Sequence, residues 1–168
     1  MNWNQIKPED FARSPFAAIG RQWMLVAAQK PDGAVNAMTA SWGGMGVLWG
    51  KNVVFAFVRP QRYTREFIDA GRFTLSFFPE EQRPALAYLG KVSGRDEPDK
   101  IAKAGLTVES LDGAPAFAQA ETTIVCRPLY AGRIDPAQFL DSGLDAKWYP
   151  DKDYHIVYVA EVESIHTR

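Results

Sequence analysis

The sequence predicts a mainly β protein, an antiparallel β-barrel or sandwich with short helices at its periphery. About six runs of β-branched and aromatic residues are long enough for strands, whereas every helical stretch is short. Of the 168 residues, 46% are hydrophobic and 23% are charged, which is ordinary for a globular chain that buries a core. We therefore expect residues 1–168 to form a single domain.

The first two strands are predicted to form a hairpin over residues 22–42. Residues 22–29 are apolar and short enough for one strand. The Pro-Asp-Gly sequence at 31–33 favours a turn, because proline fixes φ and Asp-Gly tolerates positive φ. A second strand-like run follows directly, as a hairpin requires.

The second strand leads into a glycine-rich stretch in the segment NAMTASWGGMGVLWG, residues 36–50. In an extended strand Thr39 and Ser41 share one face, and the other face carries Met38, Ala40 and Trp42. The glycines that follow are Gly43, Gly44, Gly46 and Gly50. Glycine lets a backbone approach another group closely, or turn where other residues cannot. An ordinary strand followed by a glycine-rich turn explains the same pattern without any ligand.

Further strands and helices are predicted along the rest of the chain. The strands cover residues 52–58, 72–78, 121–134 and 153–167. Pro128 cannot donate to a β-ladder, so it predicts a bulge or a sheet edge in the third of these. Short helices are expected over residues 63–71, 83–91 and 96–105, where proline near the start or glycine at the end marks a boundary.

Charge and cysteine content exclude several classes of protein. Nineteen basic and twenty acidic residues give a net charge of −1, which argues against a dedicated nucleic-acid binder. The single cysteine, Cys126, excludes a disulfide within the chain and a thiolate metal cluster, and its apolar surroundings predict a buried, inert thiol. We see no signal peptide and no apolar run of about 20 residues, so we expect a cytoplasmic protein without a membrane partner.

The clearest candidate for a ligand site is the sequence RPQRYTRE, between the strand at 52–58 and the following helix. Arg59, Arg62 and Thr64 would meet the free N–H groups of a helix N-terminus there, which suits an anion such as a phosphate. The alternative is that the arginines form solvated ion pairs with Glu66 and Asp69.

The other polar residues give weaker signals. The segment GKVSGRDEPDK mixes both charge signs, and taken alone it is typical of a solvated loop. No phosphate-binding or dinucleotide-binding glycine motif occurs in the chain. His155 and His166 both fall on the last predicted strand without metal-ligand spacing, so no metal site is expected. We expect His166 at the surface, and a spatial Ser-His-Asp triad stays open.

The order of these motifs resembles the flavin reductase-like family of FMN-binding split β-barrels, which includes flavoredoxin. The resemblance runs from NAMTASW through the glycines, VVFAFVRPQRYT, FTLSFF and KVSGRD with Asp-Lys, and so covers about residues 22–168. It implies an FMN-binding split-barrel fold. It also implies a homodimer with the flavin near the subunit interface.

The resemblance also implies which residues line the cofactor. Residues 38–42 would lie along the flavin, with hydroxyls from the strand reaching its polar edge. The segment RPQRYT would hold the phosphate, and KVSG would approach the cofactor. Many relatives carry asparagine where this chain has Ser76. The candidate cofactor-binding residues are Met38, Thr39, Ala40, Ser41, Trp42, Arg59, Arg62, Tyr63, Thr64, Ser76, Lys91, Ser93 and Gly94.

The implied function is that of an FMN-binding oxidoreductase. NADH or NADPH would reduce the flavin, and free flavin or a redox partner protein would accept the electrons. The flavin carries the chemistry, so no catalytic side chain is required, and neither histidine can be matched to one near the nicotinamide. The alternatives are a flavoredoxin-type electron carrier and a non-catalytic dimeric split-barrel module that binds another phosphorylated ligand.

Overall fold

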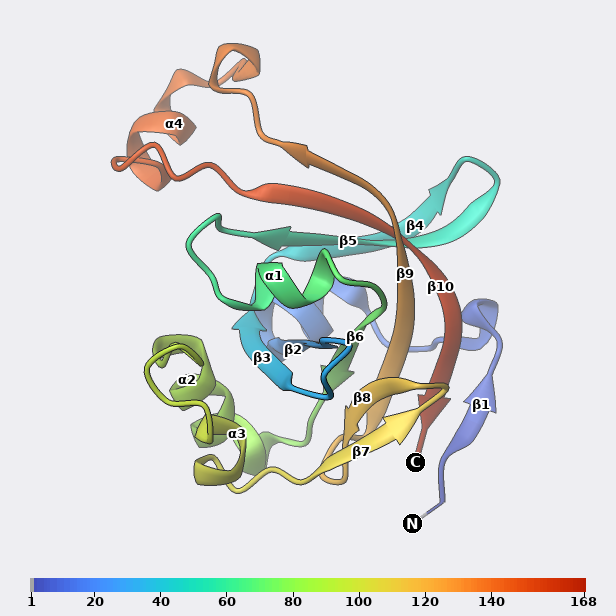
Figure 1. Ribbon diagram of the computed structural model, residues 1–168. Coiled ribbons are helices and arrows are strands. Elements are labelled where there is room, and N and C mark those ends of the chain that lie inside the picture. The colour runs from blue at the N-terminus through green and yellow to red at the C-terminus, as the bar shows by residue number, and fades with distance from the viewer. Residues whose placement is uncertain (1) are drawn as a thin grey trace.

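The computed structural model describes residues 2–168 and is built around one curved antiparallel sheet (Figure 1). The strand order is β3-β2-β6-β9-β10-β5-β4, and β1 pairs with the end of β10. A separate hairpin joins β7 to β8. The strands are β1 Asn4–Ile6, β2 Met24–Gln29, β3 Val35–Ala40, β4 Gly43–Leu48, β5 Lys51–Val58, β6 Phe73–Phe77, β7 Val108–Leu111, β8 Ala114–Phe117, β9 Thr122–Arg133 and β10 Ile156–Thr167. The predicted mainly β class is confirmed.

Short helices surround the sheet. They are η1 Pro8–Asp10, η2 Phe16–Gln22, α1 Thr64–Ile68, η3 Glu80–Gln82, α2 Arg83–Lys91, α3 Lys100–Lys103, η4 Pro136–Gln138 and α4 Ser142–Trp148. Helices were predicted where α1, α2 and α3 lie, and η2 and α4 were not anticipated. Within residues 2–168, no helix is long and apolar enough to cross a membrane.

The largest hydrophobic cluster fills the inside of the curved sheet. Alternate residues of β5, namely Val54, Ala56 and Val58, point into it and are fully buried. A second cluster packs α2 against the outer side of β2, around Leu25 and Leu89. The thiol of Cys126 lies in the first cluster, where burial raises its pKa, as expected for an inert thiol.

The predicted hairpin is confirmed, with one correction at its end. β2 and β3 pair antiparallel from Met24 opposite Ala40 to Gln29 opposite Val35. Met38 and Ala40 pack against the core, and the hydroxyl of Thr39 contacts α2 on the other side. The strand ends at Ala40, so Ser41 and Trp42 lie in the connection to β4 and do not continue the alternation.

The glycine-rich stretch forms a strand and not the expected turn. Residues 43–48 are β4, which pairs with β5 along its whole length. A Cβ at Gly43 would stand 2.9 Å from the carbonyl oxygen of Phe55, so the two backbones approach too closely there for any side chain. The turn comes later, at Trp49 and Gly50, whose φ angles are +55° and +68°.

The predicted irregularity at Pro128 is confirmed. The pairing of β10 with β9 shifts between Val159, which faces Tyr130, and Ala160, which faces Pro128. β6 covers the other edge of β9 only as far as Cys126. Pro128 therefore lies at a bulge, on a stretch of β9 that β6 does not pair with. Its lack of an N–H group removes no hydrogen bond of the sheet there.

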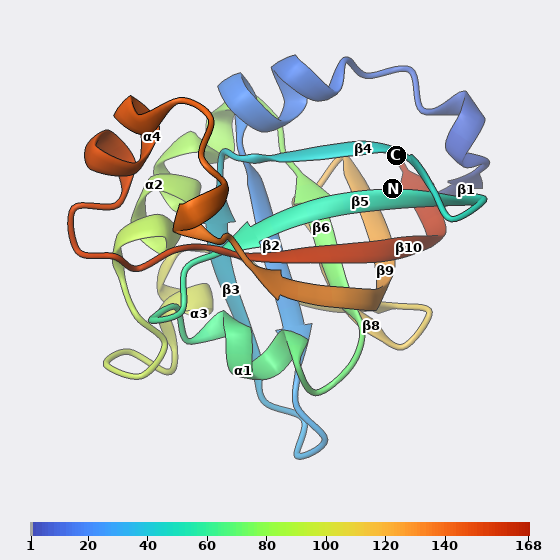
Figure 2. The same cartoon turned by 90° about the horizontal axis from the view of Figure 1, so that it is seen from above.

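Residues 134–155, which we call the arm, leave the sheet between β9 and β10 and carry η4 and α4 (Figure 1). Seen from above, α4 stands beside η2 at one end of the sheet (Figure 2). His155 belongs to the arm, because β10 begins only at Ile156. The expectation that both histidines lie on the last strand is therefore wrong for His155.

Candidate functional site

A pocket of about 210 Å³ lies where the arm returns to the sheet. Four parts of the chain form it: the end of β3 with its connection to β4, the end of β5, the turn before α1, and the arm. Its lining residues are Met38, Thr39, Ala40, Ser41, Trp42, Phe57, Arg59, Arg62, Trp148 and His155. The structure thus brings the predicted strand motif and both predicted arginines to one place.

One side of this pocket is aromatic. The ring centroids of Trp42 and His155 lie 5.0 Å apart, and Trp148 meets Trp42 edge-on at 5.1 Å. Phe57 stands on the β5 side, with its ring 6.4 Å from that of His155. These side chains form an apolar wall of the kind that a flat ring system needs.

The imidazole of His155 is buried and neutral. Its Nδ1 lies 2.8 Å from the hydroxyl of Tyr149, which is itself buried. Burial and, to a lesser extent, the nearby Arg59 guanidinium lower the pKa of His155 to about 4. Because the tyrosine hydroxyl takes up Nδ1, Nε2 is the nitrogen left to bond a ligand in the pocket.

Arg59 joins the arm to the end of β5. Its guanidinium lies 2.5 Å from a carboxylate oxygen of Asp153 and donates a hydrogen bond of 3.0 Å to the carbonyl of Trp148. Both partners belong to the arm. Arg59 therefore shapes the pocket through these contacts, and much of its charge is already balanced by Asp153.

Arg62 is the less neutralised of the two arginines. Its guanidinium donates a hydrogen bond of 3.2 Å to the carbonyl of Gly90, at the end of α2, and burial lowers its pKa. Among the described residues, no carboxylate lies within ion-pairing distance of it. A partly buried cation of this kind is well suited to bind an anion.

Thr64 is fully buried and does not face the pocket as a free hydroxyl. It accepts a hydrogen bond of 2.8 Å from Asn36 Nδ2. A Cβ at Gly94 would stand 2.2 Å from Asn36 Oδ1 and 3.1 Å from the ring of Tyr63, so the KVSG loop packs tightly against this pair. Thr64 and Gly94 thus fix the position of the segment that carries Arg62.

The remaining predicted residues are placed in different surroundings. The hydroxyl of Thr39 donates to the carbonyl of Leu86, whereas Ser41 is exposed and lines the pocket. Ser93 accepts a hydrogen bond from the N–H of Arg95, and Lys91 is exposed at the end of α2. Ser76 is fully buried in β6 and bonded to Thr123, so the structure does not bring it to the pocket.

The sequence model of the family described as the flavin reductase like domain matches residues 16–168 of the chain. The chain belongs to this family. The resemblance in its sequence motifs is therefore confirmed, and the match includes every element that lines the pocket. Among curated proteins, none is similar enough to this chain to count as a match.

Solved structures of flavin reductase-like proteins share its fold. An FMN-binding domain of a flavin reductases-like enzyme from Shewanella baltica superposes with a TM-score of 0.71 at 16% identity, over 99% of this chain and 77% of that one. The flavoredoxin of Desulfovibrio vulgaris superposes with a TM-score of 0.68 at 21% identity, over 97% of this chain and 77% of that one. The styrene monooxygenase flavin reductase of Pseudomonas putida superposes with a TM-score of 0.63 at 18% identity, over 87% of this chain and 79% of that one.

A larger apolar groove of about 580 Å³ adjoins the pocket of this flavin reductase-like chain. Ser41, Trp42 and Phe57 line both spaces. The floor of the groove comes from the first glycines of β4, and its walls come from η2 and the arm. The pocket alone is smaller than the range of about 300–1,000 Å³ that is typical of small-molecule sites. A ligand of typical size would therefore also occupy part of the groove.

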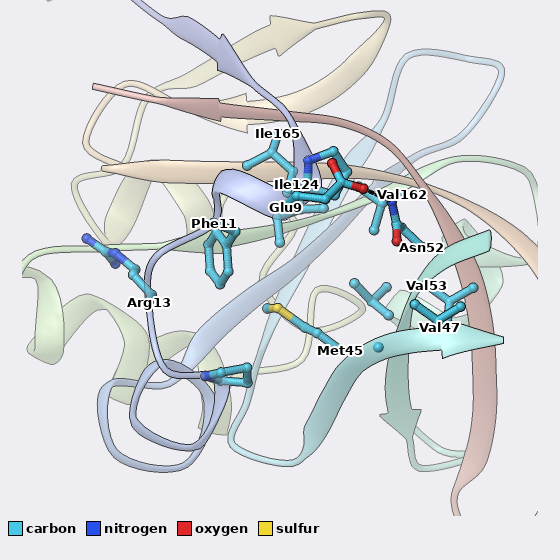
Figure 3. A pocket seen from close by; sticks show the side chains of 14 residues that line it. Glu9, Phe11, Arg13, Met45, Val47, Asn52, Val53, Ile124, Val162 and Ile165 are labelled. Atoms are coloured by element: carbon cyan, nitrogen blue, oxygen red, sulfur yellow. Dashed lines mark hydrogen bonds between the residues drawn. The ribbon is translucent and has the colours of Figure 1, made fainter. Parts of the chain in front are cut away.

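A third cavity, of about 240 Å³, lies under the N-terminal segment and is lined mainly by apolar side chains (Figure 3). Phe11 and Met45 point toward each other across it. Asn52 donates to Glu9 at 3.0 Å, and Arg13 is bonded to Glu121 through Nη2, while its buried Nη1 has no partner among the described residues. This cavity is an apolar end of the core.

His166 is buried, so the expectation that it lies at the surface is wrong. Its Nε2 lies 2.8 Å from Asp112 Oδ2 and 3.1 Å from the hydroxyl of Ser164. Ser164 donates to the same carboxylate oxygen at 2.6 Å, so its hydroxyl proton is not directed at the imidazole as a catalytic triad requires. The cluster ties the turn between β7 and β8 to β10.

Nowhere in residues 2–168 do three or more potential ligands gather for a metal ion.

Sequence reasoning missed the contribution of the arm to the pocket. Trp148, Tyr149 and His155 all come from it. A signal was present, because the carboxylate of Asp141 caps α4 by accepting from the N–H of Gly143 at 2.9 Å. Leu144 and Trp148 follow at helical spacing, a pattern that favours an amphipathic helix.

Proposed function

We propose that this flavin reductase-like chain is an FMN-binding oxidoreductase, folded as one domain, and that the pocket beside the arm holds the cofactor. The observation that carries the proposal is the polarity of the pocket. A cation without a carboxylate partner, Arg62, stands on one side, and the aromatic wall of Trp42 and Phe57 with the neutral His155 stands on the other. FMN has the matching shape, with an anionic phosphate at one end and a flat ring at the other.

The residues of the chain have separate roles in this proposal. Arg62 binds the phosphate, and the tight packing of Asn36 and Thr64 holds its segment in place. Trp42 and Phe57 exclude water from one side of the ring. The exposed hydroxyl of Ser41 and Nε2 of His155 would form hydrogen bonds with polar atoms of the ring.

The bound flavin would accept a hydride and pass electrons on, which is the chemistry that the cofactor supplies. The donor we propose is NADH or NADPH, whose nicotinamide would approach the side of the ring that Trp42 and Phe57 leave open. Free flavin or a redox partner protein would then accept the electrons. The neutral state of His155 suits this arrangement, because a buried positive charge would repel the cationic nicotinamide of the oxidised product.

We further propose that two copies of the chain associate over the groove. Two large exposed apolar side chains line it, Phe16 on η2, which is 91% exposed, and Trp42, and the arm that forms one of its walls also exposes Leu140. Exposed apolar residues that cluster around a groove are typical of an interaction surface. A second copy would cover the groove and complete the walls of the flavin site.

The proposal is tested by loading the purified protein with FMN and recording its visible spectrum, then adding NADH or NADPH without oxygen. Binding of FMN followed by bleaching with either nucleotide supports the reductase. Binding without bleaching favours a flavoredoxin-type carrier. Failure to bind FMN would contradict both, and would favour a module that takes another phosphorylated ligand.

A further inference from the structure

Lys100 is a buried lysine outside the lining of the pocket. It begins α3 and is only 2% exposed. Its ammonium donates one hydrogen bond, of 2.9 Å, to the carbonyl of Val92, in the KVSG loop between α2 and α3. An ammonium has three N–H donors, so this lysine is buried with little compensation for the loss of water.

The charges around Lys100 do not neutralise it. The charge that acts on it most is the guanidinium of Arg62, which is also a cation. The nearby carboxylates of Glu97 and Asp99 are paired with Lys103, and Glu97 also accepts from the hydroxyl of Tyr88. Across the described part of the chain, no carboxylate lies within ion-pairing distance of Lys100.

Lys100 and Arg62 therefore support the same loop from two sides. Arg62 is bonded to the carbonyl of Gly90, in the last turn of α2 before the loop, and Lys100 is bonded to the carbonyl of Val92, two residues on. Each bond fixes backbone that leads to Gly94, which is wedged against Asn36. Two like charges placed together without a counter-ion repel each other, and a bound anion would relieve that repulsion.

We propose that Lys100 is a positioning residue for the phosphate site, which fixes the KVSG loop and, together with Arg62, selects a ligand that ends in a dianionic phosphate. The inference rests on the proposed function, since the pocket must hold a flavin. It assigns a role in phosphate binding to Lys100, which is buried and does not line the pocket. Its effect reaches the ligand through the loop and through the electric field.

The protonation of Lys100 gives this inference a distinctive signature. Burial and the Arg62 charge lower the pKa of Lys100 to about 8. An anion bound beside it favours the charged form and raises that pKa. Affinity for the anion is then greatest below about pH 8 and falls above it, because a proton must be taken up on binding. The second ionisation of a phosphate ester, near pH 6, is complete in this range and does not interfere.

The test compares FMN with riboflavin, which lacks the phosphate, in titrations of the cofactor-free protein. Lys100→Met keeps the length of the side chain and removes its charge. Lys7→Met is the control, since it removes an exposed lysine that lines neither the pocket nor the groove. We expect Lys100→Met to weaken FMN binding by roughly tenfold relative to riboflavin. Lys7→Met should leave the ratio of the two affinities unchanged.

The pH profile needs no variant and supports the inference even where Lys100→Met folds poorly. For the wild type, the FMN-to-riboflavin affinity ratio should fall between about pH 7 and pH 9. In Lys100→Arg, whose charge does not titrate, the ratio should stay level over this range. Equal effects of the two methionine variants, or a level wild-type profile, would overturn the inference while leaving FMN binding intact. Absence of FMN binding in the wild type would instead overturn the proposed function.

Discussion

The hydroxyl of Tyr149 lies 2.8 Å from Nδ1 of His155, and both residues come from the arm. The arm thus supplies the imidazole of the pocket and also the group that orients it. Since Tyr149 occupies one ring nitrogen, the other has no hydrogen-bond partner among the described residues. This contact makes the arm a structural part of the pocket.

The buried state of His155 predicts an acid-dependent loss of stability. Its pKa of about 4 in the folded protein lies below its ordinary value of 6.5, so the unfolded chain binds a proton more readily. The stabilising contribution is complete above about pH 6.5 and is lost as the pH falls toward 4, by on the order of 3 kcal/mol. Chemical denaturation at a series of pH values should show that His155→Gln loses less stability than the wild type over this interval. Parallel curves for the two proteins would show that His155 is not buried neutral.

Removal of the Arg62 charge should weaken FMN binding far more than riboflavin binding. A charge-assisted contact is worth about 1.5–3 kcal/mol, which corresponds to roughly ten- to a hundredfold in affinity. Arg65→Ala is the control, because Arg65 is a half-exposed arginine of α1 whose partner is Asp69. Titrations of both variants with both ligands decide the matter. Equal losses of FMN and riboflavin in Arg62→Ala would assign Arg62 a structural role only.

Two neighbours at the end of β3 should respond differently to substitution. Ala40 packs against the core, so Ala40→Leu should lower the thermal stability of the cofactor-free protein by about 1–3 kcal/mol through overpacking. Ser41 is exposed at the pocket, so Ser41→Ala should leave folding intact and weaken FMN binding by about 0.5–1.5 kcal/mol. Thermal melts and FMN titrations measure the two effects. A Ser41→Ala variant with unchanged affinity, spectrum and rate of reduction would show that this hydroxyl has no role toward the cofactor.

The glycines of β4 should also divide into two kinds. Gly43→Ala places a Cβ 2.9 Å from the Phe55 carbonyl and 3.0 Å from Met24, and should destabilise the fold by about 1–3 kcal/mol. Gly46→Ala meets nothing within 4 Å, so it should stay within about 0.5 kcal/mol of the wild type or stabilise it slightly. Urea denaturation of the two variants side by side checks the difference. A Gly43→Ala protein as stable as Gly46→Ala would mean that β4 and β5 are not held so closely.

The exposed apolar residues around the groove predict a dimer in solution. Light scattering at micromolar concentration should give about twice the chain mass of 18.7 kDa. Replacing Phe16 and Leu140 together by serine should shift the protein toward the monomer. Val108→Ser, on the β7–β8 hairpin away from the arm (Figure 1), should leave the mass unchanged. A wild-type monomer, with or without FMN, would rule out the proposed association.

Local patterns in the sequence were sufficient to predict much of the sheet. Continuous β-branched runs marked β5 and β6, and Pro-Asp-Gly marked the first hairpin, because these signals are encoded within a few residues. Pro128 marked the bulge for the same reason. The glycines of β4 were misread, because their strand conformation depends on pairing with β5, which local propensity does not record.

The site was only partly predictable. Arg62 stood out because it lies between a buried strand and a helix. His155 and Lys100 could not be recognised, since the roles we propose for them depend on burial and on neighbours 6 to 38 residues away, such as Tyr149 and Arg62. Burial and contacts of this kind appear only when the chain is folded.

The central claim is that one pocket binds FMN with its phosphate at Arg62 and its ring against Trp42 and Phe57. A structure of the protein with FMN tests it most directly, through the distance between the phosphate oxygens and the Arg62 guanidinium. We predict a hydrogen-bonding distance of about 2.7–3.2 Å, with the ring in contact with Trp42 or Phe57. A flavin found elsewhere on the chain, or one whose phosphate lies away from Arg62, would contradict the account.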